Sequence, residues 1–307
     1  MGFKKIFLTG LCLLSINPVF SHQRKTNKKI SAREKKLDSN RFIVMTGRPK
    51  AGLFATLNFV CMLLSRYKAG NYRGIEVDFG TTGLYYEPKY GKNWWNYYFE
   101  PVCFGKKINI KKVVDVPYLD PHTDLHKKKP PIRQTMFGMI QKYFHIKPHI
   151  LDKINTFDKE NFKDYFVISV HYRGTDKIKE APRLPYEKIP EAVLDIMKSH
   201  GDKKYKIFVA TDEQAFVDYM ITLFGDLVCY KKDALRSTSG QPIHFDKNFN
   251  HYKSGEDALV DCLLLSRGNF LIRTSSNLSR WATYFNPNLP SIELSSPYGR
   301  RNNNHKF

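Results

Sequence analysis

Apolar positions in the second half of the chain follow two alternating patterns. Short uninterrupted apolar runs are typical of strands that are buried on both faces of a parallel sheet. Between them lie longer segments in which apolar residues recur every three or four positions, as on the buried side of a helix. The runs predict strands over residues 166–170, 207–210, 227–230, 270–272 and 291–294. Alternating strands and helices predict an α/β fold with a parallel, doubly wound sheet, which binds ligands at the carboxyl ends of its strands.

The helices expected between these strands carry signals at their ends. Pro190 is expected at the first position of its helix, where a proline leaves no hydrogen bond unmade. Thr211 is expected to cap the next helix, with Gln214 completing a capping box. Apolar residues at helical spacing predict three further helices over about 216–224, 257–266 and 277–285.

The first half of the chain is less regular. A strand over 42–46 leads into a turn at 47–52 and then a helix that begins at Leu53. A second strand is predicted over 75–79, and two helices over 133–157 meet near Pro148. We place the boundary between two domains near residue 160. The predicted division is a signal segment 1–21, a basic linker 22–40, an N-terminal domain 41–160, a C-terminal domain 161–298 and a tail 299–307.

Residues 80–101 are crowded with aromatic side chains and are expected to form a loop-rich stretch. The rings belong to Tyr85, Tyr86, Tyr90, Trp94, Trp95, Tyr97, Tyr98 and Phe99. Aromatic rings stack on the faces of sugars, so the stretch is a candidate platform for an acceptor. The alternative, that these rings pack between the domains, is the one we favour.

The N-terminus has the features of a cleaved secretory signal. Two lysines precede a mostly apolar stretch from Ile6 to Phe20, which is shorter than the ~20 residues that span a bilayer. The stretch ends in a site that suits a signal peptidase, so membrane association is expected only if the segment is retained. Residues 22–40 carry seven Lys or Arg and no aromatic residue, as in a solvated linker. We therefore expect an exported protein, in a Golgi lumen or a periplasm.

Composition narrows the kind of ligand. With 42% apolar and 14% aromatic residues, the 307-residue chain can bury a core. The net charge of +21 favours anionic ligands, nucleotide diphosphates included. The basic residues form no ordered stripe and no nucleic-acid-binding motif occurs, so a nucleic-acid partner is disfavoured. The four cysteines beyond the signal contain no Cys-x-x-Cys pair, which argues against a zinc ribbon, and Cys61 and Cys262 are expected to be buried thiols.

The segment with the most chemical information is HYRGTDK at residues 171–177, directly after a predicted strand. Its polar groups therefore fall at the carboxyl edge of the sheet. Arg173 supplies a planar guanidinium that can bind two phosphate oxygens, Lys177 adds a second cation, and Asp176 can hold the geometry of both. A simple Arg–Asp salt bridge on a loop is the competing interpretation.

Further segments add polar groups at the same edge. Asp212 and Glu213 follow the next strand, which leaves two adjacent carboxylates at a strand end. Asp261 lies in a strongly apolar helix, where a carboxylate is costly unless it has a partner. The N1–H and N2–H groups of a guanine base would provide such a partner, and so would a buried arginine. Residues 275–277 join a strand to a helix, whose first N–H groups need caps and can also bind phosphate.

Together these segments resemble the α-1,6-fucosyltransferases of glycosyltransferase family 23, which include the NodZ-like nodulation enzymes. The resemblance rests on the order and spacing of HYRGTDK, VATDE, DALVDCLLLSRGNFLI and SSN, and it covers residues 165–285. It implies a GT-B-like α/β fold with two Rossmann-like domains and a donor site on the C-terminal domain, facing the interdomain cleft. It also implies inverting transfer of fucose from GDP-fucose to a glycan acceptor, without a metal or another cofactor.

The resemblance implies roles for single residues. Arg173 matches the arginine that contacts the donor diphosphate, and Asp176 and Lys177 match the Asp-Lys pair of the family. Asp261 matches the guanine-binding aspartate, and Glu180 lies one position from the place of the catalytic glutamate. The implied catalytic residues are Arg173, Lys177 and Glu180, and the remaining implied donor-binding residues are His171, Asp212, Ser275, Ser276 and Asn277. Gly174 departs from the family, which has a second arginine there, and this leaves catalytic strength and donor preference open.

The residues themselves agree with this chemistry. No Asp-x-Asp sequence occurs, so the common manganese-binding motif of metal-dependent sugar transferases is absent. Side chains and helix N-termini must then stabilise the charge on the departing diphosphate. Two alternatives stay open: a non-catalytic nucleotide-sugar or glycan-binding protein of the same fold, and a transferase that uses another GDP-sugar.

Overall fold

Two sheets of mainly parallel strands form the framework of the protein. The computed structural model describes residues 40–47, 51–113, 132–174, 183–238 and 249–294. The first sheet has the strand order β3-β2-β1-β4 and the second has the order β7-β6-β5-β8-β9. The predicted signal, most of the linker and the tail from residue 299 lie outside the described residues.

The first sheet is built from β1 (Phe42–Met45), β2 (Gly74–Val77), β3 (Cys103–Gly105) and β4 (Ile110–Val113). β1 is parallel to β2 and to β4, whereas β3 is antiparallel to β2. One long helix, α2 (Leu53–Lys68), connects β1 to β2 and buries its apolar residues against the sheet. The aromatic stretch forms the short elements η1 (Pro88–Tyr90) and α3 (Trp95–Tyr98).

The second sheet is fully parallel. Its strands are β5 (Phe166–Tyr172), β6 (Tyr205–Thr211), β7 (Val228–Cys229), β8 (Phe270–Thr274) and β9 (Ser291–Leu294). Its helices are α6 (Lys188–His200), α7 (Gln214–Phe224), α8 (His251–Arg267) and α9 (Asn277–Phe285), with η3 (Gly225–Leu227) between α7 and β7. The prediction of an α/β fold with a parallel sheet in the second half is confirmed.

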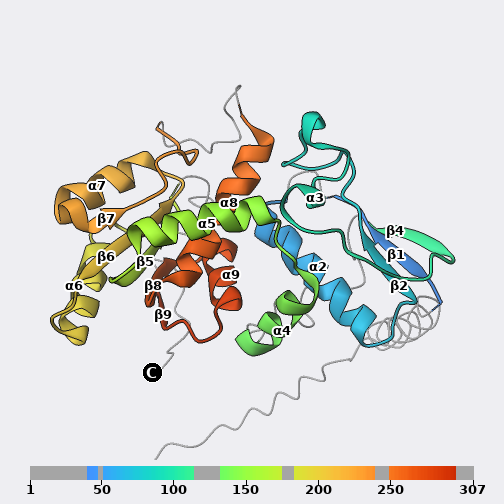
Figure 1. Ribbon diagram of the computed structural model, residues 1–307, viewed down its shortest axis with the longest axis horizontal. Helices are drawn as coiled ribbons and strands as arrows, with labels where there is room; N and C mark the ends of the chain where they lie inside the picture. Colours follow the sequence, from blue (N-terminus) through green and yellow to red (C-terminus); the bar gives the residue numbers. More distant parts are fainter. Residues whose placement is uncertain (1–39, 48–50, 114–131, 175–182, 239–248, 295–307) are drawn as a thin grey trace, which may run out of the picture.

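Helices form the layer between the two sheets. In Figure 1 the second sheet, with α6 and α7, lies at the left and the first sheet at the right, and α2, α5 (Pro148–Asn161), α8 and α9 lie between them. One hydrophobic core runs through this layer and contains residues of both sheets and of α2, α8 and α9. Trp281 of α9 shows the contact directly, because its indole Nε1 donates to Asn58 Oδ1 of α2 at 2.8 Å.

A second, smaller core fills the outer face of the second sheet, under α6 and α7. The residues near 160, where we predict the domain boundary, lie at the end of α5, just before β5. α4 (Arg133–Tyr143) and α5 pack against α9 and α8, so both precede the boundary in sequence but contact helices of the second sheet.

Three helix starts differ from the predicted ones. α6 begins at Lys188, so Pro190 is its third residue rather than its first. Thr211 does not cap α7, because its hydroxyl accepts from the backbone N–H of Glu213, which precedes the helix. α8 begins at His251, where Asn250 accepts from Lys253 N, and not near residue 257. The first turns of α8 are polar, so they broke the apolar pattern on which the prediction depended.

The aromatic stretch is mainly a packing element, as favoured from the sequence. Trp94 and Trp95 are fully buried, and their indole N–H groups donate to Thr82 O and Glu100 O. Tyr90 is the exception, with 46% of its surface exposed. It stacks on Tyr252 of α8 with ring centroids 3.8 Å apart.

The cysteines and the helices add two further observations. Cys61, Cys229 and Cys262 are buried free thiols and Cys103 is an exposed one, so the prediction for Cys61 and Cys262 is confirmed. Across the described ranges, every helix falls short of the length and hydropathy that a membrane span requires.

Candidate functional site

Three strands of the second sheet meet at Arg173, directly after β5. The backbone N–H of Arg173 donates to Thr274 Oγ1 at the end of β8, at 3.0 Å. The N–H of Gly174 donates to one oxygen of Asp212, after β6, at 3.0 Å. The other oxygen of Asp212 lies 3.3 Å from Arg173 Nε. The Arg173 side chain remains 33% exposed, so a fixed backbone presents a partly accessible guanidinium at the carboxyl edge.

Gly174 is required by a close approach rather than by its backbone angles. A Cβ at this position would overlap the carboxylate of Glu213. That carboxylate is buried and accepts from Arg183 Nη2 at 2.6 Å and from the hydroxyl of Tyr186 at 2.8 Å. Burial and the hydrogen bond to Glu213 raise the pKa of Tyr186 above its usual value. The absence of a second arginine therefore has a local reason, since a larger side chain would displace Glu213.

Arg183 brings a guanidinium to the far side of this carboxylate. Its Nε lies 3.1 Å from the hydroxyl of Tyr172, which in turn donates to Leu184 O at 2.7 Å. The Arg183 carbon Cζ lies 5.1 Å from the centroid of the Tyr186 ring. Glu213, Arg183, Tyr186 and Tyr172 thus form one connected group beside Gly174.

A buried ionic cluster lies beside α8. Asp257 accepts from Lys231 Nζ and from Lys253 Nζ, both at 2.5 Å, and from the backbone N–H of Leu235 at 2.9 Å. Lys253 also pairs with Asp233 at 2.9 Å. Lys231 and Asp257 are both almost fully buried. Charges at this depth are tolerated because each is paired, so the cluster fixes the segment after β7 against α8.

Asp261 lies one helical turn beyond Asp257 and has no such pairing. It is 8% exposed, and its Oδ1 accepts no hydrogen bond within the described structure. Burial raises the pKa of Asp261 to about 6, against the opposing influence of Lys231, Arg236 and Lys253. A buried acceptor without a donor is rare in proteins and calls for an explanation such as a ligand.

Arg236, whose charge acts on Asp261, adds donors. Its Nε and Nη2 are buried and donate no hydrogen bond in the part of the chain that the structure describes, while its Nη1 makes one long contact with Ala234 O at 3.5 Å. The guanidinium lies 5.1 Å from the ring centroid of Tyr230. Asp261 and Arg236 together offer an anionic acceptor and cationic donors to a ligand with complementary groups.

The N-terminus of α9 completes the carboxyl edge. Ser276 caps the helix and accepts from Leu278 N at 3.3 Å, as expected for one of the two serines. Ser275 is exposed just before it, and Asn277 is the first helical residue. Thr274, which holds Arg173, is the neighbour of Ser275. The start of α9 therefore lies beside Arg173, where its N–H groups favour an anion.

His171 lies within β5, beside Arg273 of β8, and is buried. Arg273 pairs with Glu293 of β9, while its Nε and Nη1 make no hydrogen bond to described residues. The structure thus brings together Arg173, Asp212, His171 and residues 274–277 at one edge, with Asp261 on the adjacent helix. Asp176, Lys177 and Glu180 lie outside the described residues.

The sequence analysis missed the residues that hold this edge in place. Asp257 precedes Asp261 by four positions, so both lie on one face of the helix, and this spacing could have found it. Lys231 follows the shortest strand and showed no such signal. Glu213 was noted only as a second carboxylate, although it fills the space beside Gly174.

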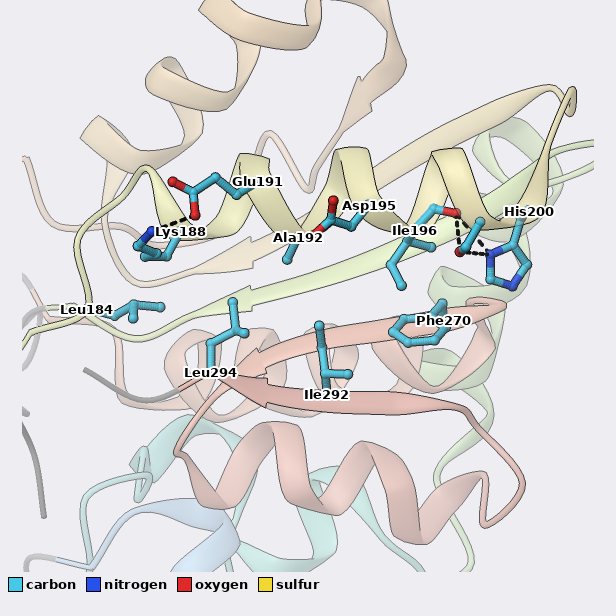
Figure 2. A pocket seen from close by; sticks show the side chains of 11 residues that line it. Leu184, Lys188, Glu191, Ala192, Asp195, Ile196, His200, Phe270, Ile292 and Leu294 are labelled. Atoms are coloured by element: carbon cyan, nitrogen blue, oxygen red, sulfur yellow. Dashed lines mark hydrogen bonds and ion pairs between the residues drawn. The ribbon is translucent and has the colours of Figure 1, made fainter. Parts of the chain in front are cut away.

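A separate hollow lies on the outer face of the second sheet. Figure 2 shows a groove between α6 and the strands β8 and β9, with a volume of about 680 Å³. Its floor is apolar, with Phe270, Ile292 and Leu294 among its lining residues, and Lys188 on its rim pairs with Glu191 at 2.6 Å. The groove contains none of the predicted site residues, so it is not the candidate site.

Comparison with known proteins identifies relatives of the chain. The family model of nodulation protein Z (NodZ) matches residues 134–301, more than half of the chain. The nodulation protein Z of Bradyrhizobium diazoefficiens (strain USDA 110) is 28% identical over 161 residues, which cover 49% of this chain. The match spans 43% of the length of that relative.

Solved structures show the same fold. The crystal structure of the α-1,6-fucosyltransferase NodZ soaked with GDP-fucose is 17% identical, with a TM-score of 0.53, over 84% of this chain and 100% of that one. The fucosyltransferase NodZ from Bradyrhizobium is 19% identical, with a TM-score of 0.53, over 83% and 96% of the two chains. The prediction of a GT-B-like α/β fold is therefore confirmed.

Proposed function

The chain belongs to the NodZ family of nodulation protein Z, and from this premise we propose that it is a fucosyltransferase. It moves fucose from GDP-fucose to a hydroxyl group of a glycan acceptor. The observation that carries the proposal is the buried Asp261 carboxylate, whose Oδ1 accepts no hydrogen bond from the described residues. GDP-fucose and GDP are the ligands in the NodZ crystals, and a guanine base carries N–H donors for the Asp261 Oδ1 that accepts no hydrogen bond from the described residues.

The base is recognised by paired donors and acceptors. Guanine presents two adjacent donors, N1–H and N2–H, which the Asp261 carboxylate accepts. Its O6 and N7 are acceptors that suit the guanidinium of Arg236. Uracil has a single N–H between two carbonyl groups, so a uridine nucleotide leaves part of this set unsatisfied, at a cost of about 1–3 kcal/mol for each buried group.

The diphosphate binds at Arg173. The guanidinium of Arg173 binds phosphate oxygens, and the N–H groups at the start of α9, next to Ser275, Ser276 and Asn277, add a favourable dipole. Lys177 contributes a second cation, as the family resemblance implies. These groups stabilise the negative charge that grows on the leaving diphosphate.

Transfer is a single displacement with inversion. The acceptor oxygen forms a bond to the anomeric carbon of fucose while the bond from that carbon to the diphosphate oxygen breaks. The proton of the acceptor hydroxyl passes to a general base, for which Glu180 is the candidate from the sequence. The leaving GDP is stabilised by side chains and a helix N-terminus, so we propose that no metal is needed. The absence of an Asp-x-Asp sequence supports this.

Thermal unfolding of the purified chain with GDP, GDP-fucose, GDP-mannose and UDP tests the donor class. A ligand at 100 times its Kd adds about 2.7 kcal/mol of stability. We expect stabilisation by the three guanine nucleotides and none by UDP at equal concentration, and loss of the effect in Asp261→Asn but not in Asp226→Asn, which changes an exposed carboxyl group. Equal stabilisation by UDP would overturn the proposal.

Release of GDP from GDP-fucose with a set of glycan acceptors tests the transfer itself. We expect release that depends on the acceptor and that persists in a chelator, whereas loss of activity in the chelator would refute the metal-free step.

The close approach of Glu213 to Gly174 favours one alternative, a binding protein without activity, because it places a carboxylate where the family has a cation. Binding of GDP-fucose without GDP release would establish it.

Export of the protein is also a proposal. It is supported by the sequence of residues 1–21, with its basic start and apolar stretch. N-terminal sequencing of the protein recovered from a secretory host tests it, and an intact Met1 in the cytoplasm would contradict it.

A further inference from the structure

The end of the first sheet that lies away from the candidate site is strongly basic. The amino ends of β1 and β2 lie there, together with the last turn of α2 and the connection from β3 to β4. The basic end, with the adjoining edge strand β4, comprises Arg41, Arg66, Lys68, Arg73, Lys106, Lys107, Lys111 and Lys112. Figure 1 shows α2 ending at the lower right, away from the second sheet.

The charge at this end is one-sided. Among residues 40–47 and 51–113, this end has eight basic side chains and one carboxylate, Glu76, so the net charge is +7. Glu76 pairs with Lys107 at 2.9 Å. Within residues 78–100, which lie at the opposite end of the same sheet, there are three acidic and two basic residues, a net charge of −1. Among the described residues, the positive charge of this sheet is therefore concentrated at the end that points away from the candidate site.

Two large apolar side chains are exposed among these lysines. Ile108 is 41% exposed and Ile110 is 54% exposed. Lys106 and Lys107 precede them, and Lys111 and Lys112 follow them. Ile110 begins the edge strand β4 and Ile108 lies just before it; an exposed apolar residue on an edge strand favours unwanted pairing with other chains unless something covers it. Lysines beside apolar groups are typical of surfaces that meet the boundary between lipid headgroups and acyl chains.

We propose that the basic end binds an anionic lipid surface. Ile108 and Ile110 lie at the boundary of the acyl chains, and the surrounding lysine and arginine side chains bind lipid phosphate and carboxylate groups. The partner is thus a membrane leaflet with acidic headgroups. Binding in this orientation leaves the carboxyl edge of the second sheet directed away from the lipid, where a glycan acceptor can reach it.

The linker supports the same orientation. β1 begins at the basic end, so residues 22–40, with their seven Lys or Arg, join the described structure there. Basic residues that each bind lipid weakly strengthen one another on the same surface. Once one of them is bound, the remaining basic residues are held close to the lipid at high local concentration. The exposed isoleucines favour lipid over nucleic acid, since a phosphate backbone gains nothing from them.

Co-sedimentation of the full chain with vesicles tests the proposal. We expect binding to vesicles with 30% phosphatidylserine, weak binding to pure phosphatidylcholine, and a decrease with salt. Lys106→Glu/Lys112→Glu removes two lysines, each worth roughly fivefold in binding near the surface, and should lower binding by at least 25-fold. Ile108→Ser/Ile110→Ser should lower it at least fivefold without changing the charge.

Matched controls change equally exposed residues elsewhere. Lys159→Glu/Lys163→Glu keeps the same net charge as the first variant, and Leu194→Ser/Leu223→Ser removes two exposed apolar side chains from α6 and α7. Both should bind vesicles like the unchanged chain. All variants should keep the same thermal midpoint and the same affinity for GDP, which separates this proposal from the proposed function.

Three results would overturn the proposal. The first is no binding of the unchanged chain to the acidic vesicles. The second is equal loss in the control variants, which would mean that only total charge matters. The third is duplex DNA binding that falls in Lys106→Glu/Lys112→Glu but not in Ile108→Ser/Ile110→Ser, with vesicle binding unaffected by either, which would identify a nucleic-acid surface instead.

Discussion

The two sheets have the same parallel core, yet their carboxyl edges contain different chemistry. The edge of the second sheet has charged groups, and Asp261 and Arg236 keep polar atoms without hydrogen bonds from the described residues. The same edge of the first sheet is filled with aromatic rings, where Phe79 packs on Trp94 with centroids 4.3 Å apart. The carboxyl edge of such a sheet is a place where a ligand can bind, and its side chains decide whether one does.

The two carboxyl edges also contribute differently to the stability of the fold. Trp94 and Trp95 bury large apolar surfaces and satisfy both indole N–H groups, so the first edge stabilises the fold. The second edge buries the carboxylate of Asp261 without a matching donor, which opposes folding. A binding site keeps such a group because the ligand supplies the partner.

The largest expected effect is on the stability of the filled edge. Trp95→Ala should lower the free energy of unfolding by about 3–5 kcal/mol, since it leaves a cavity in the core and removes the hydrogen bond to Glu100 O. Urea denaturation measures it. Tyr90→Ala is the matched control, because Tyr90 is half exposed and should cost under about 1 kcal/mol. If Trp95→Ala lowered the free energy of unfolding as little as Tyr90→Ala, the claim that the aromatic edge of the first sheet stabilises the fold would be contradicted.

The next effect is on transfer at the charged edge. Arg173→Ala should lower kcat/KM for GDP-fucose by about 10²–10³-fold, because a charged donor to the leaving diphosphate is removed. The free energy of unfolding should change little, since Thr274 and Asp212 still hold the backbone. Steady-state kinetics measures kcat/KM and denaturation measures the free energy of unfolding. Arg267→Ala, which removes the surface ion pair with Asp158, is the control for both. Full activity in Arg173→Ala would refute its role.

Asp261→Asn should change stability and binding in opposite directions. The folded pKa of about 6 lies above the usual aspartate value of 3.8, so the folded protein binds this proton more tightly than the unfolded chain. Protonation therefore stabilises the fold below about pH 4, and this contribution is lost as the pH rises to about 6. At pH 7 the neutral amide should raise the free energy of unfolding by an amount on the order of 1–3 kcal/mol.

Donor affinity should follow the same titration. The carboxylate form accepts the N–H groups of guanine, so GDP affinity should fall by about tenfold for each pH unit below about 6. Asp261→Asn should bind GDP more weakly at pH 7 and lose this pH dependence. Calorimetric titration between pH 5 and pH 8 measures it, with Asp226→Asn expected to behave like the unchanged chain. A flat profile for the unchanged chain would count against the base contact.

The smallest effect concerns Gly174. Gly174→Ala should cost about 1–2 kcal/mol, because the new Cβ displaces the Glu213 carboxylate from Arg183 and Tyr186. In the background of Glu213→Ala the same change should cost almost nothing. A double-mutant cycle of unfolding free energies measures this coupling. Additive costs would mean that Glu213 does not fill the space beside Gly174.

The sequence predicted the second sheet well because its central strands β5, β6 and β8 are short, mostly buried runs. It predicted the position of Arg173 for the same reason, because residues that directly follow the strands of a parallel sheet lie at its carboxyl edge. It could not predict the pairing of Lys231 with Asp257, which lie 26 positions apart and meet only through the fold. The start of α8 was misplaced because its first turns are polar and show no apolar spacing, although Glu256 and Asp257 are buried there in ion pairs.

Gly174 shows another limit of sequence reasoning. The family resemblance indicated only that Gly174 stands where the family has a second arginine, and nothing in the sequence relates Gly174 to Glu213. Only the register of β5 against β6 places the two side by side. The aromatic stretch was easier, because eight rings within 15 residues cannot all be exposed in a stable protein.

The most direct test of the base contact compares GDP with inosine diphosphate, whose base lacks the 2-amino group. Isothermal titration of the unchanged chain and of Asp261→Asn gives four affinities. We expect the unchanged chain to prefer GDP by at least about tenfold, because one charge-assisted hydrogen bond is worth about 1.5–3 kcal/mol, and we expect Asp261→Asn to bind both nucleotides with equal, weaker affinity. Equal affinities for the unchanged chain, or the same preference in Asp261→Asn, would contradict recognition of guanine by this carboxylate.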